Sequence, residues 1–350
     1  MLNTNGNPIA VLLSPPLNVY VRDRTNGMTT LVSLNLSGLA GGNGDSIPVE
    51  ISTNGQYVLF ESCASDLVPN DTNGVSDIFV RDLANGSNIL VSVGTNGGSA
   101  VQGSFLGPPA LSRGSVMTPD GRYVAFVSAA NNLVPNDTNG IPDVFVRDLQ
   151  SGTTTLVSVG AMPTGIVVSN IGVGTSESPG ITPDGRYVVF FSTATNIVPE
   201  VTNIYGEIYV RDMVGGITTW ASVNTYSILQ PIFGPTNTVS YNHVISNDGQ
   251  FVAYEASPTS ASFSGISPGG IILRYSLLTG LTDVVNTNAP GVGTGSEVTA
   301  RNLDMTPEGR FIAFVGRTNK SSCIYVWDAQ SNTTTLVSGD FVRQYAVWAR

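Results

Sequence analysis

The chain has 350 residues, with 15 Lys+Arg against 25 Asp+Glu and a formal charge of -10 at neutral pH. Lys320 is the single lysine, and because nucleic-acid binding needs a basic surface that neutralises phosphates, the composition excludes DNA and RNA as expected partners. No apolar run approaches the roughly 18 residues that cross a bilayer, so the sequence predicts no membrane span.

The ends of the chain and its cysteines bear on its compartment. Residues 1–13 lack a basic segment followed by a long apolar stretch and a cleavage site, so no signal peptide is visible. Cys63 and Cys323 allow at most one disulfide, and we expect two buried thiols instead. The low charge and the 39 glycines are typical of proteins outside the cytoplasm, which predicts a periplasmic, secreted or cell-surface location.

Along the chain, one unit recurs six times. It begins with a four-residue turn that ends in glycine, followed by an apolar run such as "YVAFVS" (123–128). A second strand such as "DVFVRD" (143–148), a two-residue hairpin signal and a third strand such as "TTLVS" (154–158) complete it. A weaker strand precedes the turn, as in "IPVEI" (47–51). We name these strands A to D, beginning with the weaker one.

No segment carries apolar residues at helical spacing over more than about ten residues, which predicts an all-β fold. Six units of four antiparallel strands are the signature of a six-bladed β-propeller. The predicted blades are 1–34 plus 341–350 (blade 1), 45–93 (blade 2), 112–159 (blade 3), 176–223 (blade 4), 240–287 (blade 5) and 299–339 (blade 6).

The two chain ends are predicted to share blade 1. The first unit begins directly at its turn, "NTNG" (3–6), and has no strand A before it. The last residues, "RQYAVWAR" (343–350), align with strand A of blades 5 and 6, so Tyr345 to Trp348 are expected to supply it and close the ring. The alternative is that this segment begins a truncated seventh repeat.

The pattern "TPDGRYVAFVS" followed by "DVFVRDL" and "SGTTTLVSV" resembles the TolB-like propeller repeats of bacterial envelope and secreted proteins. The resemblance covers essentially the whole chain and weakens in blade 5, at "SNDGQFVAY" and "LRYSLLTG". It implies a propeller, but such propellers serve as docking platforms, as peptidase gates and as sugar-processing enzymes, so it narrows function little.

The connections define two faces. In an antiparallel blade the A-to-B and C-to-D turns share one face, and the B-to-C and D-to-A connections share the other. The second set is long and rich in Gly, Ser and Pro, as in 94–113 and 160–180, so this long-loop face is the candidate binding surface and is expected to be adaptable. The short B-to-C loops of blades 1 (15–17) and 6 (317–322) predict a lopsided face.

The string "PNDTNGVSDIFVRDL" (69–83) returns as "PNDTNGIPDVFVRDL" (135–149) in the B-to-C loops of blades 2 and 3. A D-x-N-G-x-x-D spacing suits Ca²⁺, which prefers several oxygens from a tight loop. The alternative is a metal-free Asx turn with the last Asp capping strand C. The candidate ligands are Asp71, Asn73, Asp77, Asp137, Asn139 and Asp143. In blade 4, where Glu200, Asn203 and Glu207 replace them, a site should be weaker or absent.

The sequence assigns no catalytic residue. His243, on strand A of blade 5, is expected to be a packing or solvent-facing residue. Glu50 and Asp304 lie on strands A of blades 2 and 6, near the expected channel, so a carboxylate-based glycan-active enzyme stays an alternative. The repeated Arg-Asp pairs indicate a structural role, for which inter-blade hydrogen bonding is the candidate. They lie at Arg22-Asp23, Arg81-Asp82, Arg147-Asp148 and Arg211-Asp212.

Three hypotheses for function follow. The first is a non-catalytic extracytoplasmic propeller that binds a protein or glycan through its long-loop face, with Ca²⁺ as a candidate stiffening ion. The second is a structural subunit of a surface layer or filament, formed by homo-assembly. The third is the carboxylate enzyme.

Overall fold

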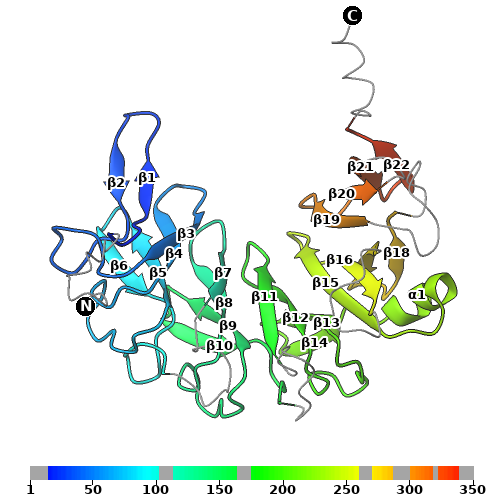
Figure 1. The fold of residues 1–350 in the computed structure, drawn as a ribbon, viewed down its shortest axis with the longest axis horizontal. Coiled ribbons are helices and arrows are strands. Elements are labelled where there is room, and N and C mark those ends of the chain that lie inside the picture. The colour runs from blue at the N-terminus through cyan, green and yellow to red at the C-terminus, as the bar shows by residue number, and fades with distance from the viewer. Residues whose placement is uncertain are drawn as a thin grey trace, which may run out of the picture.

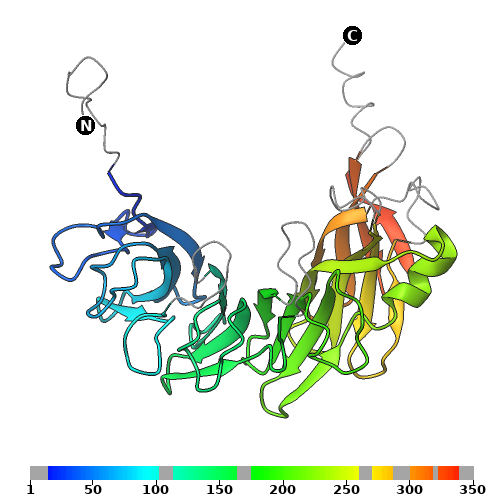
Figure 2. The ribbon, with the colours of Figure 1, turned by 60° about the horizontal axis from the view of Figure 1, so that its bottom comes forward.

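The computed structural model describes residues 15–101, 113–163, 175–259, 270–286, 300–317 and 322–338, and every structural statement concerns these residues. Their strands form five four-stranded antiparallel sheets and one two-stranded sheet. Within each four-stranded sheet the strands are neighbours in chain order, as the A-to-D scheme predicts. The sheets follow one another along an arc, with β1 and β2 at one end and β19 to β22 at the other (Figures 1 and 2). The fold is a six-bladed β-propeller.

The strand boundaries match the repeat closely. Blade 1 contains β1 (Tyr20–Arg22) and β2 (Thr29–Leu31); blade 2 contains β3 (Ser46–Ile51), β4 (Tyr57–Ser62), β5 (Asp77–Asp82) and β6 (Ser87–Leu90); blade 3 contains β7 (Arg113–Met117), β8 (Tyr123–Ser128), β9 (Asp143–Asp148) and β10 (Thr153–Leu156); blade 4 contains β11 (Ser176–Ile181), β12 (Tyr187–Ser192), β13 (Glu207–Asp212) and β14 (Ile217–Trp220); blade 5 contains β15 (Thr238–Ile245), β16 (Phe251–Pro258), β17 (Ile271–Ser276) and β18 (Thr282–Val284); blade 6 contains β19 (Ala300–Met305), β20 (Phe311–Arg317), β21 (Ser322–Asp328) and β22 (Thr333–Leu336).

Strands B and C form the buried centre of each blade. Every residue of β5 is buried, including the charged Asp77, Arg81 and Asp82 that flank its apolar centre. Between blades the apolar faces pack against each other: Ile78 and Val80 of blade 2 share a core cluster with Val124 and Phe126 of blade 3. Within a blade, an aromatic ring of strand B stacks on one of strand C at nearly the same centroid distance each time: Phe60–Phe79 5.5 Å, Phe126–Phe145 5.7 Å, Phe190–Tyr209 5.6 Å and Phe314–Tyr325 5.6 Å.

The prediction of an all-β chain missed one helix, α1 (Thr225–Phe233), in the D-to-A connection between blades 4 and 5. The helix buries Thr225 and Leu229, which lie one turn apart, and contacts β15 and β16. Pro231 lies inside it, and a segment of nine residues is too short for apolar periodicity to reveal. No helix in the described part of the chain is long and apolar enough to cross a membrane.

The C-to-D hairpins are longer than predicted. Asp82 pairs with Ser87 and Asp148 with Thr153, so four residues, not two, form each of these connections. The Asp82 carboxylate accepts the backbone N–H groups of Ala84 and Asn85, and Gly86 adopts a positive φ of 65°. The aspartate therefore organises a longer turn that an Asn-Gly pair alone does not reveal.

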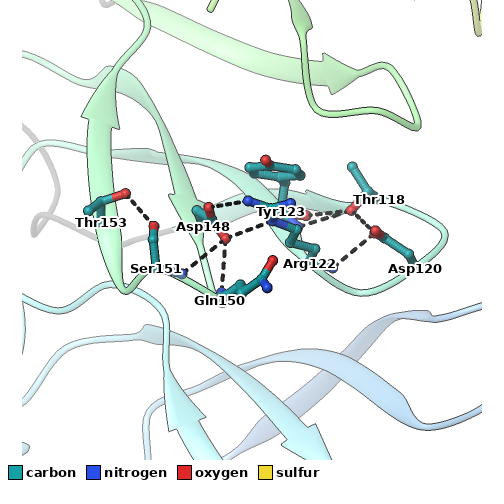
Figure 3. Close-up of polar contacts among 8 residues, drawn as sticks. All are labelled: Thr118, Asp120, Arg122, Tyr123, Asp148, Gln150, Ser151 and Thr153. Atoms are coloured by element: carbon teal, nitrogen blue, oxygen red, sulfur yellow. Dashed lines mark hydrogen bonds and ion pairs between the residues drawn. The ribbon is translucent and has the colours of Figure 1, made fainter.

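The two turn types share one face, as predicted. In blade 3 the A-to-B turn and the C-to-D turn lie side by side (Figure 3). Arg122 forms a bidentate ion pair with Asp148 at 3.1 and 2.9 Å, and its guanidinium lies 4.6 Å from the ring centroid of Tyr123. Arg186–Asp212 and Arg310–Asp328 repeat this clamp, and in blade 2 Gln56 donates to Asp82 at 3.2 Å.

This geometry corrects the role suggested for the repeated Arg-Asp pairs. The arginine of each pair donates across its own blade, from strand C to strand D: Arg22 to Thr29, Arg81 to Asn88, Arg147 to Thr154 and Arg211 to Thr218. The aspartates organise the turns of their own blade. The prediction that these pairs form inter-blade hydrogen bonds was therefore wrong, because both residues of each pair bond within their own blade.

The predicted ring closure lies outside the described residues, because strand B of blade 1 and the C-terminal strand A fall within 1–14 and 339–350. The described part of blade 1 is a hairpin in which Tyr20 pairs with Leu31. Val19 and Val32 beside it are buried in one cluster with Val58 and Phe60 of blade 2. Strands C and D of blade 1 thus already cover blade 2.

Candidate functional site

The B-to-C loop of blade 2 is held by a polar lock formed by Asn73, Asp77 and Ser92. The Asn73 side-chain amide donates to Asp77 Oδ2 at 2.5 Å and to the carbonyl of Ala100 at 3.0 Å. Its Oδ1 accepts the Val75 N–H at 3.0 Å, which forms an Asx turn. Ser92 Oγ donates to Asp77 Oδ1 at 2.6 Å and accepts the Ile78 N–H. The loop, strand C and strand D are therefore fastened at one point.

The same lock recurs in blade 3. Asn139 donates to Asp143 at 2.6 Å and to the carbonyl of Ala161 at 3.0 Å, and its Oδ1 accepts the Ile141 N–H at 3.1 Å. Ser158 donates to the other Asp143 oxygen at 2.5 Å.

Blade 4 retains the lock in spite of its divergent loop sequence. Asn203 donates to Glu207 at 2.5 Å and to the carbonyl of Thr238 at 2.9 Å, while the Ser222 hydroxyl donates to the second Glu207 oxygen. Trp220 Nε1 adds a donor to Glu207 at 3.1 Å. The longer glutamate side chain thus takes the same role as the aspartates.

The D-to-A connection and the next B-to-C loop are joined across the blade boundary. Thr95 N–H donates to the Asn132 carbonyl at 2.8 Å, and Val101 N–H donates to Asn132 Oδ1 at 2.8 Å. At the next boundary, Met162 N–H donates to Asn196 Oδ1 at 3.2 Å. The described residues of the connection are therefore hydrogen-bonded to the loops on both sides of it, and the adaptable character expected of this face stays a prediction.

The side chains that this face exposes are mainly small and uncharged. Apolar residues of the loops, such as Leu67 and Leu133, are buried beneath it. Equivalent positions of the three blades are exposed, namely Pro69, Asn70 and Thr72 in blade 2, Pro135, Asn136 and Thr138 in blade 3, and Pro199, Glu200 and Thr202 in blade 4. The result is a surface of prolines, amides and hydroxyls with a single carboxylate among these nine positions.

Burial controls the acidic groups of the locks. Desolvation raises the pKa of Asp77 and of Asp143 to about 7, against the hydrogen bonds from Ser and Asn, which lower it. Desolvation likewise raises the pKa of Asp71, Asp137 and Glu207. In each lock, desolvation therefore opposes the charged form of the carboxylate, while the donated hydrogen bonds favour it.

The six predicted calcium ligands lie in two loops, three residues in each, and in each loop the Asn side chain contacts the second Asp. In both loops the Asn directs its NH₂ group at the second Asp and its oxygen at a backbone N–H. The Asx turn is one element of the metal-free alternative, and calcium binding by these residues stays a prediction. For a cation to lie between Asp71 and Asp77, the Asn73 amide would have to turn its oxygen toward the cation and release the Ala100 carbonyl. Among the described residues, no group of three or more His, Cys, Asp or Glu side chains has a metal-holding arrangement.

The structure engages Glu50 and Asp304 with backbone amides. Glu50 accepts the Met117 N–H at 2.9 Å, and Asp304 accepts the Met305 N–H at 2.8 Å. Their strands, β3 and β19, lie in different arms of the arc (Figure 1). The described structure does not bring the two carboxylates together.

His243 and the cysteines have structural surroundings. His243 lies on β15 beside a β-bulge between Tyr241 and Val244, and desolvation lowers its pKa to about 4. Cys323 is buried on β21, as expected, but Cys63, which follows the last residue of β4, is exposed. Within the described part of the chain neither cysteine forms a disulfide.

Sequence reasoning missed the serines that complete the locks. Ser92, Ser158 and Ser222 lie two residues after the end of strand D in blades 2 to 4 and are fully buried. The signal was present, because the third strand ends in serine after an apolar residue in these blades. A serine buried at the same place in successive repeats indicates a shared polar partner.

No protein-family model matches the chain, and no curated protein sequence matches it. Solved structures do resemble it. Dipeptidyl peptidase 4 from Porphyromonas gingivalis aligns over 93% of this chain and 44% of its own, with a TM-score of 0.56 and 11% identity. TolB from Acinetobacter baumannii aligns over 93% and 61%, with a TM-score of 0.42 and 13% identity. Oligogalacturonate lyase in complex with manganese aligns over 93% and 73%, with a TM-score of 0.48 and 12% identity.

At these identities the likenesses show the propeller fold alone. The chain spans less than two thirds of the length of the TolB and peptidase chains. Proteins of this fold include peptidases and a lyase as well as TolB, so function rests on the site of this chain and not on its neighbours.

Proposed function

We propose that the protein is a non-catalytic, extracytoplasmic propeller that binds a protein or glycan partner through the long-loop face of blades 2 to 4. The observation that carries the proposal is the repeated lock, which fastens three successive B-to-C loops and joins them to the D-to-A connections. A surface that is already ordered loses little conformational entropy on binding, which favours affinity. Its amides and hydroxyls suit hydrogen bonding to sugars or to neutral peptide segments.

Several observations support a binding role over catalysis. The locks hold their carboxylates buried and bonded to internal donors, whereas a glycosidase needs two carboxyl groups facing the substrate. Glu50 accepts the Met117 N–H and Asp304 accepts the Met305 N–H, so both carboxylates have backbone donors. The low charge supports an extracytoplasmic setting.

The test uses two triple variants that add the same charge to opposite faces. Thr72→Arg, Thr138→Arg and Thr202→Arg change the long-loop face at equivalent positions of blades 2 to 4. Ala84→Arg, Gln150→Arg and Val214→Arg change the C-to-D turns of the same blades. The wild type is screened on a glycan array and against an extract of envelope proteins, and its hits are measured with both variants.

We expect the affinity of the long-loop variant for the partner to be at least tenfold lower than that of the wild type. The turn variant should keep the wild-type affinity. Loss with the turn variant alone would overturn the choice of face. Cleavage of an arrayed glycan by the wild type, abolished by Glu50→Gln or Asp304→Asn, would replace the proposal with the enzyme alternative.

Calcium remains a prediction within this proposal, and it has a separate test. An ion bound by Asp71, Asn73 and Asp77, and by their blade 3 counterparts, would raise the melting temperature in Ca²⁺ relative to chelator, because binding to the native state stabilises it. Asp71→Asn with Asp137→Asn should abolish the difference. Equal melting temperatures of the wild type in Ca²⁺ and in chelator would remove calcium and leave the binding-face proposal standing.

A further inference from the structure

Six Asn-x-Ser/Thr tripeptides, the acceptor sequence for N-linked glycans, occur in the chain, and their structural settings differ. An accessible acceptor needs an exposed asparagine whose side-chain amide is not already bonded within the protein. It also needs an exposed hydroxyl two residues later, because the transferring enzyme recognises both groups. The structure describes five of the six, the exception being Asn319. The tripeptides begin at Asn35, Asn70, Asn85, Asn136, Asn319 and Asn332.

Three of the five described tripeptides have an asparagine that is already bonded. Asn35 Oδ1 accepts the hydroxyl of the serine in its own tripeptide at 2.7 Å, so the two recognition groups bond to each other. Asn85 Nδ2 donates to Asp82 Oδ2 at 2.6 Å. Asn332 Oδ1 accepts the Trp327 Nε1–H at 3.0 Å. Transfer of a glycan to any of these three would first have to break a hydrogen bond.

Asn70 and Asn136 have no such bond. They lie at equivalent positions in the B-to-C loops of blades 2 and 3, and both are exposed. Neither side chain forms a hydrogen bond within the described residues. Their φ angles of 64° and 65° lie in the left-handed region, which asparagine adopts more readily than most residues. The backbone conformation thus accounts for asparagine at these positions and leaves its amide available.

Both recognition groups of each free tripeptide are exposed, while the residue between them is buried. In blade 2, Asp71 is 6% exposed, whereas Asn70 and Thr72 on either side of it face solvent. Blade 3 repeats this pattern at 136–138. A Cβ added at Gly74 would meet nothing within 4 Å, so there is space beside the loop. The asparagine amide and the threonine hydroxyl are therefore accessible together.

Blade 4 offers a comparison within the same chain. Its equivalent tripeptide is Glu200-Val201-Thr202, in which Val201 is buried and the two flanking residues are exposed. Asn203 holds this loop through the same lock that the other two blades use. The acceptor position of an otherwise similar loop is therefore filled by a residue that cannot accept a glycan.

We propose that Asn70 and Asn136 are N-glycosylation sites, which place one glycan on blade 2 and one on blade 3 of the long-loop face. In the transfer, the asparagine Nδ2 bonds to the anomeric carbon of an oligosaccharide carried on a polyprenyl diphosphate. The bond from that carbon to the diphosphate oxygen breaks, the lipid diphosphate leaves, and Nδ2 gives one proton to a base of the transferase. The inference rests on the extracytoplasmic location in the proposed function, because such glycans belong to secreted proteins.

The test treats the folded full-length chain with an oligosaccharyltransferase and a polyprenyl diphosphate-linked oligosaccharide, and reads the product by intact mass and peptide mapping. We expect a mass gain of two glycans, located on Asn70 and Asn136, with the other three described tripeptides unmodified. A synthetic peptide of residues 67–76 is treated in parallel. A folded chain that gains no mass, whether or not the peptide is modified, would overturn the proposal. Equal modification of the three bonded asparagines would overturn it as well.

Three variants at exposed positions test the assignment residue by residue. Thr72→Val and Thr138→Val keep the side-chain volume, remove the hydroxyl and should each lose one glycan. Glu200→Asn provides an acceptor at the equivalent position of blade 4 and should gain a third glycan. Glycans that persist in both valine variants would contradict the assignment, as would a Glu200→Asn chain with no additional glycan.

The reaction contains no binding partner, so its outcome is separate from that of the binding screens, which use the unmodified chain. A chain that binds a partner but accepts no glycan keeps the proposed function and loses this inference. A chain that accepts both glycans but binds nothing keeps the inference and loses the binding role.

Discussion

Blade 5 and blades 2 to 4 reach the same sheet with different polar chemistry. In blades 2 to 4 a buried carboxylate begins strand C and bonds to an Asn of the loop and a Ser of strand D. In blade 5 the equivalent of Asp77 is Ile271, and Asn286 accepts the Ile272 N–H in place of the serine. The strand order and apolar core are unchanged. The difference teaches that apolar packing builds the blade, whereas the lock orders the loops.

Blade 5 also fastens to its neighbour in its own way. Arg274 lies between the rings of Phe251 and Trp327, bonds to Asp283 and donates to the Gly309 carbonyl. Val80 has the equivalent position in blade 2 and packs into the apolar cluster instead. The boundary between blades 5 and 6 therefore includes a hydrogen bond and a cation–π contact from Arg274, while the boundary between blades 2 and 3 depends on apolar contact.

The largest expected effect concerns the apolar boundary. Gly121→Ala places a Cβ 2.3 Å from the Tyr57 ring at a φ of +80°, whereas Gly55→Ala, at +71°, meets nothing within 4 Å. Both variants lose about 1 kcal/mol from the positive φ. Gly121→Ala should lose about 1–3 kcal/mol more because of overpacking. Denaturant unfolding measures the difference, and equal losses would contradict the role of the tyrosine contact.

A smaller effect concerns the locks and pH. The pKa of Asp77 and of Asp143 is about 7 in the folded protein, above the ordinary value of 3.8, so the folded state holds protons that the unfolded state has released. Their contribution to stability is complete below about pH 4 and is lost as the pH rises through 7. Asp77→Asn with Asp143→Asn should therefore lose less stability than the wild type between pH 5 and 8.

Thermal unfolding in chelator checks this prediction. His243, whose depressed pKa gives the opposite trend at lower pH, is present in both proteins and cancels in the comparison. The lock account fails here if the double variant shows the same pH dependence as the wild type.

The smallest effect is expected at the turn face. Arg122→Gln gives blade 3 the residue that blade 2 has at Gln56, which bonds to its aspartate singly. The Arg122 side chain is 41% exposed, so solvent screens the ion pair and the loss should be well below that of Gly121→Ala. Urea unfolding of this variant measures the loss of stability. A loss near that of Gly121→Ala would contradict the expectation that the ion pair contributes less than the apolar boundary.

The repeat made the blades predictable because each strand carries its own apolar period and each turn its glycine. The helix escaped because Pro231 and nine residues leave no clear period. The C-to-D connections were predicted to have two residues because the dipeptide signal does not include the preceding aspartate, whose hydrogen bonds form the longer turn. Four of the six proposed ligands do meet in pairs, namely Asn73 with Asp77 and Asn139 with Asp143. Their serine partners lie just after strand D. Spacing within one loop cannot reveal these partners, because they are about 15 residues away in the sequence.

The central claim is that the long-loop face of blades 2 to 4 is ordered before any partner binds. Hydrogen exchange measured by mass spectrometry tests it at the loop amides of Val75, Thr95, Val101 and Ile141, all of which donate hydrogen bonds. The account predicts slow exchange in the wild type, and faster exchange at Val75 and Val101 alone in Asn73→Ala. Fast exchange at all four amides in the wild type would contradict it.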